Sequence, residues 1–237
     1  MFKKIKNIKI NYKQYGEGGD VVLLHGWGQN IQMMDPLGKK LLNHRITIID
    51  LPGFGLSEEP DKVYSILDYA DLVHKLLEEL NIKKPILIGH SFGGRIAICY
   101  ASLYDTEKMI LFGSPCVRHN YKSKKQTFFK IMKKIIIFKP LINLLKNHLG
   151  SPDYQKASPK MKDILVKTVN LDLSTYAKKV KCETLLIWGE NDTAVPIDQA
   201  RELDNLLSNS ALIILPGTHY CYLENLERVV SILNNFI

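Results

Sequence analysis

The stretch GHSFG at residues 89–93 indicates the fold of this chain more directly than any other part of the sequence. It follows the apolar run ILI at 86–88, typical of a buried strand, and it leads into RIAICY at 95–100, typical of a helix. In this setting the pattern G-x-S-x-G predicts a strained turn that exposes the hydroxyl of Ser91. The glycines let the backbone pass closely because they lack a Cβ, and the helix start offers free N–H groups to an anion. An ordinary glycine turn with a capping serine is the alternative.

A serine nucleophile requires a base and an orienting acid, and both residue types follow downstream. The apolar residues 184–189 predict a strand, and Glu190 and Asp192 come directly after it. Residues 211–215 predict the next strand, which is followed by His219. The order serine, acid, histidine is that of hydrolase folds built on a nucleophile elbow. Both candidates lie just past the carboxyl end of a strand, where open α/β sheets place their sites.

Four motifs resemble those of the α/β-hydrolase superfamily of serine esterases and lipase-like proteins. They are HGWG at 25–28, DLPGFGLS at 50–57, the serine turn, and the loops that carry Asp192 and His219. The resemblance extends from about Val21 to the C-terminus and is weakest in the middle of the chain. It implies an α/β fold with a mostly parallel central sheet flanked by helices and an inserted helical lid. The same fold serves many chemistries, so it does not by itself define a substrate.

The resemblance implies a catalytic triad of Ser91, Asp192 and His219. The family pattern, GEND in this chain, places the acid at Asp192 and leaves Glu190 as a solvated or hydrogen-bonding loop residue. His219 occupies the family's position after the last strand, where the acid would hold one ring nitrogen while the other faces the serine. The other histidines are expected to be structural or to lie on the surface: His25, His44, His74, His90, His119 and His148.

The oxyanion hole is expected to consist of two backbone N–H groups. One belongs to Phe92, the residue after the nucleophile. The other is the N–H of Trp27, which resembles the family's donor after His-Gly. Since both donors are main-chain groups, the two side chains are free either to line the pocket or to pack in the core. His25 is expected to brace the loop that carries the second donor.

The remaining pattern predicts alternating strands and helices. Residues 6–13 alternate in polarity, which predicts an edge hairpin strand paired with the strand at 21–24. Further strands are expected at 46–50 and 109–112. Helices are expected at about 33–42, 65–80, 196–207 and 226–236.

Length and composition are typical of a single domain covering residues 1–237, with 46% hydrophobic residues. No apolar run is long enough to span a membrane, and the first residues lack the apolar core of a secretory leader. The four cysteines have no metal-ligand spacing, so neither a metal nor a cofactor is expected. These features favour a reducing cytoplasm. The four cysteines are Cys99, Cys116, Cys182 and Cys221. Cys221 lies two residues after His219 but is expected to pack in the core.

The segment 116–180 lies between two predicted strands, where this family inserts a helical lid, so the core is expected at 1–115 and 181–237. A capping box at Ser123 and a serine–proline pair at 158–159 predict two helix starts. A break at Pro140 and a stop at Gly150 divide the first part of the segment. Phe129 and Met132 are expected to line the substrate pocket from the lid.

The positive charge of the chain is concentrated in this segment. Residues 117–150 hold eight lysines and one arginine without an acid, so this +9 subtracted from the formal +8 leaves −1 for the rest. A solvated outer lid face is the simplest interpretation. Attraction of anionic substrates and weak contact with an anionic membrane surface are the alternatives. Nucleic-acid binding is not expected, because no recognised nucleic-acid-binding motif accompanies the charge.

Arg95 lies one helical turn after Ser91 in the sequence GGR. This resembles the elbows of the menaquinone-pathway lyase and related carbon–carbon bond hydrolases, which hold substrate carboxylates with arginines. The lid has a single arginine, Arg118, where such enzymes tend to have more. A structural salt bridge of Arg95 with the sheet edge or lid is the alternative.

The combined pattern predicts a serine hydrolase that cleaves the carboxylic ester of a small or medium acyl substrate through an acyl-enzyme intermediate. A carbon–carbon bond hydrolase or lyase with the same triad is the second interpretation. A non-catalytic receptor for a small ligand is the third. The expected partner is a small-molecule ester or acyl substrate, and the sequence carries no signal for an oligomeric state.

Overall fold

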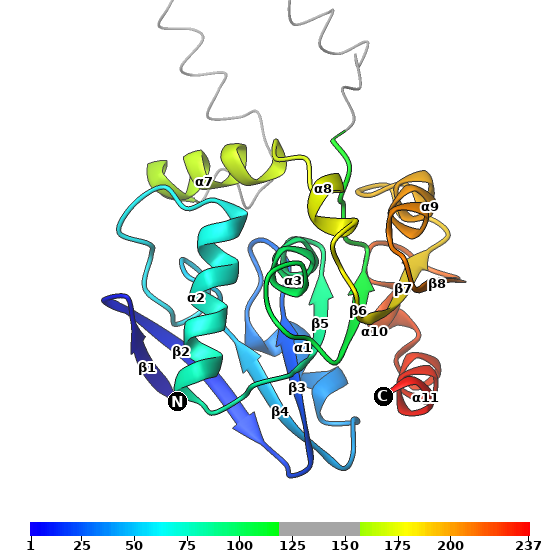
Figure 1. The fold of residues 1–237 in the computed structure, drawn as a ribbon, viewed down its shortest axis with the longest axis horizontal. Coiled ribbons are helices and arrows are strands. Elements are labelled where there is room, and N and C mark those ends of the chain that lie inside the picture. Colours follow the sequence, from blue (N-terminus) through cyan, green and yellow to red (C-terminus); the bar gives the residue numbers. More distant parts are fainter. Residues whose placement is uncertain (119–156) are drawn as a thin grey trace, which may run out of the picture.

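The computed structural model describes residues 1–118 and 157–237. Within these ranges the strands form one eight-stranded sheet in the order β1-β2-β4-β3-β5-β6-β7-β8 (Figure 1). The features expected at Ser123, Phe129, Met132, Pro140 and Gly150 lie outside the described residues. The strands are β1 Phe2–Ile5, β2 Ile8–Tyr15, β3 Gly19–Leu24, β4 His44–Ile49, β5 Ile86–His90, β6 Lys108–Phe112, β7 Glu183–Gly189 and β8 Ser210–Leu215.

The sheet is mostly parallel, as the sequence predicts. All neighbouring pairs from β4 to β8 are parallel, while β2 runs antiparallel to both β1 and β4. The prediction that the first alternating strand pairs with residues 21–24 is wrong. This strand, β2, pairs with β4, and Tyr12 lies opposite Ile49. In the sheet β4 separates β2 from β3. The alternation at residues 6–13 therefore identified a strand but not its partner.

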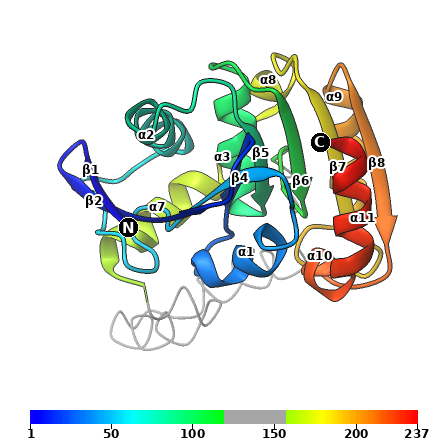
Figure 2. The same cartoon turned by 90° about the horizontal axis from the view of Figure 1, so that it is seen from below.

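Two sets of helices cover the two faces of the sheet (Figures 1 and 2). The buried apolar residues of α2 and α3 belong to one core cluster together with Leu203 of α9, while those of α1 and α11 belong to the other. Each buried parallel strand contributes to both clusters, as expected for a sheet with helices on both faces. The helices are α1 Ile31–Gly38, α2 Ile66–Glu79, α3 Phe92–Ala101, α7 Pro159–Val169, α8 Ser174–Ala177, α9 Ile197–Leu206, α10 Cys221–Glu224 and α11 Leu226–Phe236.

Helix starts follow the capping residues of the sequence. Ser65 caps α2 and forms a reciprocal capping box with Asp68. Ser158 caps α7, and Pro159 occupies its first position, as predicted. The range expected for the first helix is wrong, because Asn30 caps α1 two residues earlier than expected and the helix ends at Gly38. None of the helices in the described residues is long and apolar enough to cross a membrane.

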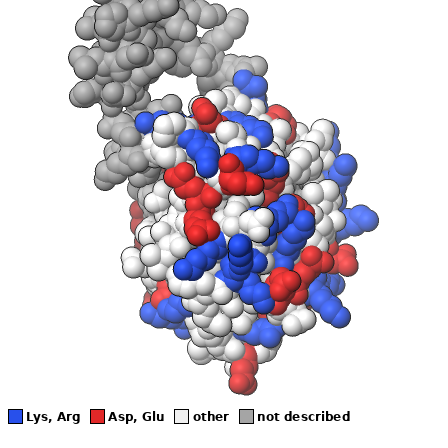
Figure 3. All heavy atoms as spheres, turned by 90° about the vertical axis from the view of Figure 1, so that its left-hand side faces the viewer, with Lys and Arg blue, Asp and Glu red and all other residues white. Residues whose placement is uncertain are grey.

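Charges of both signs are interspersed on the face shown in Figure 3. Ion pairs join β1 and its following turn to α2 at this edge, where Lys3 contacts Glu79 and Lys6 contacts Asp71. Such exposed pairs contribute only about 0–1 kcal/mol each. This face therefore has the mixed charge expected from the near-zero net charge of the sequence outside residues 117–150.

Candidate active site

Ser91 occupies a left-handed turn between β5 and α3, with φ +51° and ψ −109°. This conformation is uncommon for a residue with a side chain and is typical of functional sites. The Ser91 N–H donates to the Phe112 carbonyl at 2.9 Å, and the Ser91 carbonyl accepts the Arg95 N–H at 3.1 Å. The side chain forms no capping hydrogen bond to α3. Hydrogen bonds to β6 and α3 thus fix the backbone, while the hydroxyl is not used to cap the helix.

Glycine is required where the elbow helix crosses the sheet. A Cβ on Gly93 would overlap the main-chain carbonyl of Leu24 and press on that of His25. Neither backbone group can move without disturbing β3. The second glycine of the motif therefore permits a close approach between helix and strand, as predicted.

His219 and Asp192 form the closest pair of titratable side chains near the elbow. His219 Nδ1 lies 2.8 Å from Asp192 Oδ2, and the carboxylate is almost completely buried. The other carboxylate oxygen accepts the N–H groups of Ala194 and Val195 at 2.9 and 2.8 Å. Because an ionised carboxylate can only accept, a neutral His219 ring carries its proton on Nδ1 and presents Nε2 as the basic nitrogen.

Glu190, the rival acid, is exposed and lies near the side chain of Asn191 at 3.3 Å. Its carboxylate forms no hydrogen bond to His219 among those of the described residues. The geometry therefore pairs the histidine with Asp192.

The carboxyl ends of four neighbouring strands bring this pair beside the elbow. His90 Nε2, one residue before Ser91, lies 3.1 Å from the main-chain oxygen of His219, and the two rings are 4.7 Å apart. A Cβ on Gly113, just after β6, would touch both the His219 ring and the Asp192 carboxylate. The three residues expected to form the triad therefore share one edge of the sheet.

The two N–H groups expected to form the oxyanion hole belong to neighbouring residues in space. The rings of Trp27 and Phe92 pack edge to face with centroids 5.2 Å apart. Within residues 1–118 and 157–237, neither main-chain N–H donates a hydrogen bond. Free N–H groups beside an elbow are what stabilisation of an oxyanion requires.

His25 braces the loop that carries Trp27. Its Nδ1 donates to the Gly26 carbonyl at 2.7 Å, and its Nε2 accepts the Leu51 N–H at 3.0 Å. Complete burial lowers the pKa of His25 to about 4. The ring is therefore a neutral structural connector between two loops, as the sequence suggested.

Comparisons with known proteins agree with this geometry. A family model of the α/β-hydrolase fold matches residues 20–126. The AB hydrolase superfamily protein YisY of Bacillus subtilis is 26% identical over 99% of this chain and 97% of its own length. The chain has the α/β-hydrolase fold, and the family model and the relatives all indicate the α/β-hydrolase superfamily. The solved structures below share its fold.

Two further relatives cover nearly the whole α/β-hydrolase chain. The pimeloyl-(acyl-carrier protein) methyl ester esterase of Aliivibrio fischeri is 25% identical over 96% of this chain and 97% of its own length. The 2-hydroxy-6-oxononadienedioate/2-hydroxy-6-oxononatrienedioate hydrolase of Escherichia coli is 26% identical over 98% of this chain and 92% of its own. Relatives of this kind support an enzyme of the hydrolase class.

Among solved structures, an esterase from Exiguobacterium antarcticum superimposes with a TM-score of 0.78 at 22% identity, covering 99% of this chain and 98% of its own. The enol-lactonase from Burkholderia xenovorans LB400 gives a TM-score of 0.80 at 19% identity, covering 100% and 99%. At these sequence identities the structural similarity shows a shared fold and no more.

A cavity of ≈ 260 Å³ adjoins the loop of Trp27 in this α/β-hydrolase. Its aromatic wall packs on the residue after Ser91, since the rings of Trp27 and Phe54 lie 5.2 and 6.1 Å from the ring of Phe92. Sequence reasoning missed Phe54 and Met161, although both lie in segments that it singled out. The lining residues are Trp27, Gly28, Gly53, Phe54, Glu59, Ala157, Ser158 and Met161.

Arg95 is not among the residues that line this cavity. The residue is 4% exposed, and its guanidinium donates to the main-chain oxygens of Pro115 and Thr168 at 2.8 and 2.9 Å, and also to that of Leu171. These contacts favour a structural role, although the partners are carbonyls and not the carboxylate of the expected salt bridge. We therefore leave Arg95 out of the group that would bind substrate.

The cysteines of the hydrolase are all free. Cys221 lies two residues after His219 but is buried in the core, and burial raises the pKa of its thiol to about 12. A thiol of that pKa is not a nucleophile near neutral pH. The candidate nucleophile at this edge of the sheet is therefore Ser91.

Proposed function

We propose that this protein is a serine hydrolase that cleaves carboxylic esters of small or medium acyl groups. The observation that carries the proposal is the 2.8 Å contact between His219 and Asp192 beside the left-handed turn at Ser91. A hydrolase as such is supported by the relatives, and the ester substrate is the part proposed. The cavity beside the Trp27 loop supports a site for the acyl group, because its aromatic wall packs on the residue after Ser91.

In the proposed reaction His219 Nε2 takes the proton of the Ser91 hydroxyl as its oxygen attacks the ester carbonyl. Asp192 holds the ring and stabilises the imidazolium that forms. The N–H groups of Trp27 and Phe92 bind the developing oxyanion. The imidazolium then protonates the departing alcohol, which leaves an acyl-serine. Water repeats the sequence, with its proton going to His219, and the acid is released.

The test is a panel of chromogenic esters from acetyl to octanoyl, assayed with the wild type and with Ser91→Ala. We expect turnover in the wild type and a loss on the order of 10³-fold or more in the variant, with folding retained. Ser102→Ala, at the end of the same helix, is the matched control and should stay within about threefold. A serine-directed phosphonate should label Ser91 alone.

Full activity of Ser91→Ala, or labelling at another residue, would show that the nucleophile is wrongly assigned. Binding of esters without any turnover would instead favour a small-ligand receptor.

Cleavage of a carbon–carbon bond, by a hydrolase or lyase, is the other reaction that this triad could support. One relative is named for a hydrolase of dioate compounds. Arg95, the candidate for holding a substrate carboxylate, is buried against main-chain oxygens. Ester hydrolysis is therefore the better supported reaction.

The segment 116–180 is proposed to act as the lid, and the cytoplasm is proposed as the location. The described part of the segment supports the first proposal, since Met161 of α7 lines the cavity. The four free cysteines support the second, because a reducing compartment keeps thiols unpaired.

A further inference from the structure

Arg95 connects three segments that are far apart in sequence. It lies in the first turn of α3, where its own N–H donates to the Ser91 carbonyl. One terminal nitrogen donates to Pro115 after β6, and the other donates to Thr168 and Leu171 at the end of α7. The helix that starts at the candidate nucleophile is thereby bonded directly to α7.

The bonding partners suit a buried cation. Thr168 lies in the last turn of α7, where main-chain carbonyls carry the negative end of the helix dipole, and its carbonyl also accepts the Leu171 N–H at 3.3 Å. The guanidinium of this buried residue would be costly to desolvate without such acceptors. Its Nε has no hydrogen-bond partner in the described residues, so the group depends on the carbonyls at its two ends.

The opposite end of α7 forms a wall of the cavity. Met161, in the first turn, is 3% exposed and lies so close to Gly53 that a Cβ there would collide with its sulfur atom. The capping Ser158 donates to the Glu59 carboxylate at 3.0 Å, and all four residues line the cavity. Figure 1 shows α7 lying across the end of the molecule above α2.

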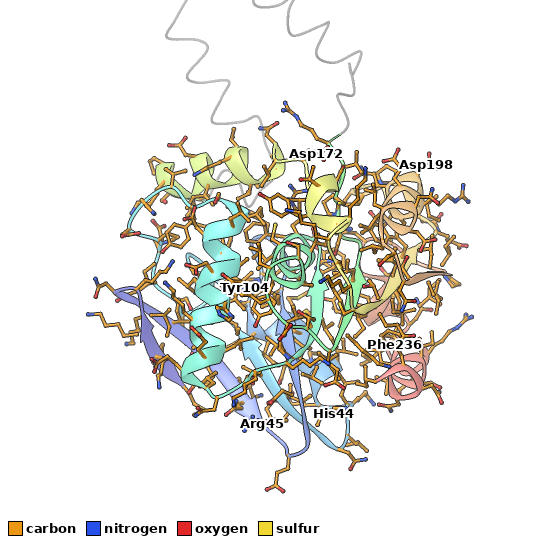
Figure 4. All side chains as sticks on the ribbon, viewed as in Figure 1. His44, Arg45, Tyr104, Asp172, Asp198 and Phe236 are labelled. Carbon is orange, nitrogen blue, oxygen red and sulfur yellow. The ribbon has the colours of Figure 1, made fainter. Side chains whose placement is uncertain are left out.

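The polar neighbourhood of Arg95 belongs to the same end of the molecule. Asp172, which follows Leu171, accepts the main-chain N–H groups of Arg118 and Ser174. Figure 4 shows Asp172 near α7 and α8, at the end opposite His44. The C-terminal attachment of α7 is thus built around Arg95 and its carbonyl partners.

We propose that Arg95 is a positioning residue that bonds α7 to the nucleophile's own helix and thereby sets the length of acyl chain that the cavity accepts. Because α7 supplies Met161, a helix released at its C-terminal end would shift this wall relative to Ser91. The proposal rests on the proposed esterase function for its kinetic readout.

The test compares Arg95→Met, Arg95→Lys and the control Arg201→Met. Arg201 is an exposed arginine of α9 that forms a long ion pair with Asp198, at 3.8 Å. Amide hydrogen exchange is measured over residues 159–169, with α2 and α11 as internal references. kcat and KM are measured for esters from acetyl to octanoyl.

In Arg95→Met we expect exchange in α7 to rise about tenfold or more, while the reference helices change little. The ratio of kcat/KM for octanoyl to acetyl esters should rise about tenfold, mainly through KM. Arg95→Lys should recover part of both effects because it keeps a donor and a charge. Arg201→Met should change neither.

Unchanged exchange in α7, or an unchanged acyl profile, would overturn the proposal. Equal acceleration in all helices would do so too, since it would indicate a purely global role. Should Arg95→Met fail to fold, Arg95→Lys and Met161→Ala provide the same comparison, and Met161→Ala must shift the acyl profile. Absence of ester turnover in the wild type would overturn the proposed function instead, and the exchange data alone would decide whether Arg95 anchors α7.

Discussion

His90 Nε2 lies 3.1 Å from the main-chain oxygen of His219, so the residue before the candidate nucleophile contacts the residue that carries the candidate base. Burial, with His219 nearby, lowers the pKa of His90 to about 3. The ring is therefore neutral near pH 7 and donates through one nitrogen at a time. The proton lies either on Nε2, facing the His219 oxygen, or on Nδ1, facing the Gln29 side-chain oxygen at 3.2 Å.

We expect His90→Leu to lower kcat about three- to tenfold, with a smaller effect on KM. With the proton on Nε2, the substitution removes one hydrogen bond, worth about 0.5–1.5 kcal/mol, from the support of the His219 loop. A change of 1.4 kcal/mol corresponds to a factor of ten in rate. Steady-state kinetics on a short ester measure the effect.

The control for this prediction is His44→Leu, at the opposite end of the sheet (Figure 4). It should leave kcat within about twofold. A kcat for His90→Leu equal to that of the wild type would show that the contact does not position the base.

Asp192→Asn should reduce kcat on the order of 10³–10⁴-fold, because an amide would no longer hold His219 in the tautomer with its proton on Nδ1. Glu190→Gln should change kcat less than about threefold, since this carboxylate is exposed and forms no hydrogen bond to His219 among the described residues. Both variants are assayed on the same ester. Comparable losses in the two would reverse the choice of acid.

The neutral, buried His25 predicts a pH dependence of stability. Its folded pKa, about 4, lies below the value near 6.5 of an unfolded chain. The unfolded state therefore binds the proton first as the pH falls, and stability declines below about pH 6.5 by about 1.4 kcal/mol per unit from this group. Urea unfolding between about pH 4.5 and 7.5 measures the slope.

In His25→Asn this slope should decrease by about the same amount, whatever the absolute stability of the variant. Identical slopes for the two proteins would mean that His25 is already protonated in the fold.

The elbow glycine Gly93 should not tolerate a methyl group. Gly93→Ala would press its Cβ against the main-chain oxygens of Leu24 and His25, and we expect a loss of about 1–3 kcal/mol or more in unfolding free energy. Gly19→Ala, at the start of β3, meets only the edge of the His44 ring at 3.4 Å. It should stay within about 0.5 kcal/mol of the wild type. Equal stability of both variants would contradict the close approach at Gly93.

Local chemistry made much of this structure predictable. Ser65 and the Ser158–Pro159 pair mark two helix starts because a cap uses atoms only a few residues apart. The elbow at Ser91 was predictable for the same reason, since a strand, a glycine turn and a helix follow one another directly. The pairing of β2 with β4 was not, because its partner lies more than thirty residues further along the chain and alternation specifies a face but no neighbour.

The candidate site was likewise only partly predictable from the sequence. The order of Ser91, Asp192 and His219 could be read from positions after predicted strands. The environment of Arg95 could not, because its acceptors are main-chain carbonyls, which every residue possesses. The first helix began early because Asn30 supplied a cap that apolar periodicity does not reveal. Sequence patterns thus located the side chains with distinctive chemistry but not the backbone atoms they bind.

The outer side of α7 is attached to the loop before α2 by lysines that also donate to backbone atoms. Lys160 Nζ reaches the Pro60 carbonyl at 2.8 Å, and Lys167 Nζ reaches the Val63 carbonyl at 3.0 Å. These main-chain carbonyls remain available when the side chains around them are substituted. Residues of this loop, including the cavity residue Glu59, can therefore diversify without undoing the attachment, so selectivity and docking can evolve separately at this end of the molecule.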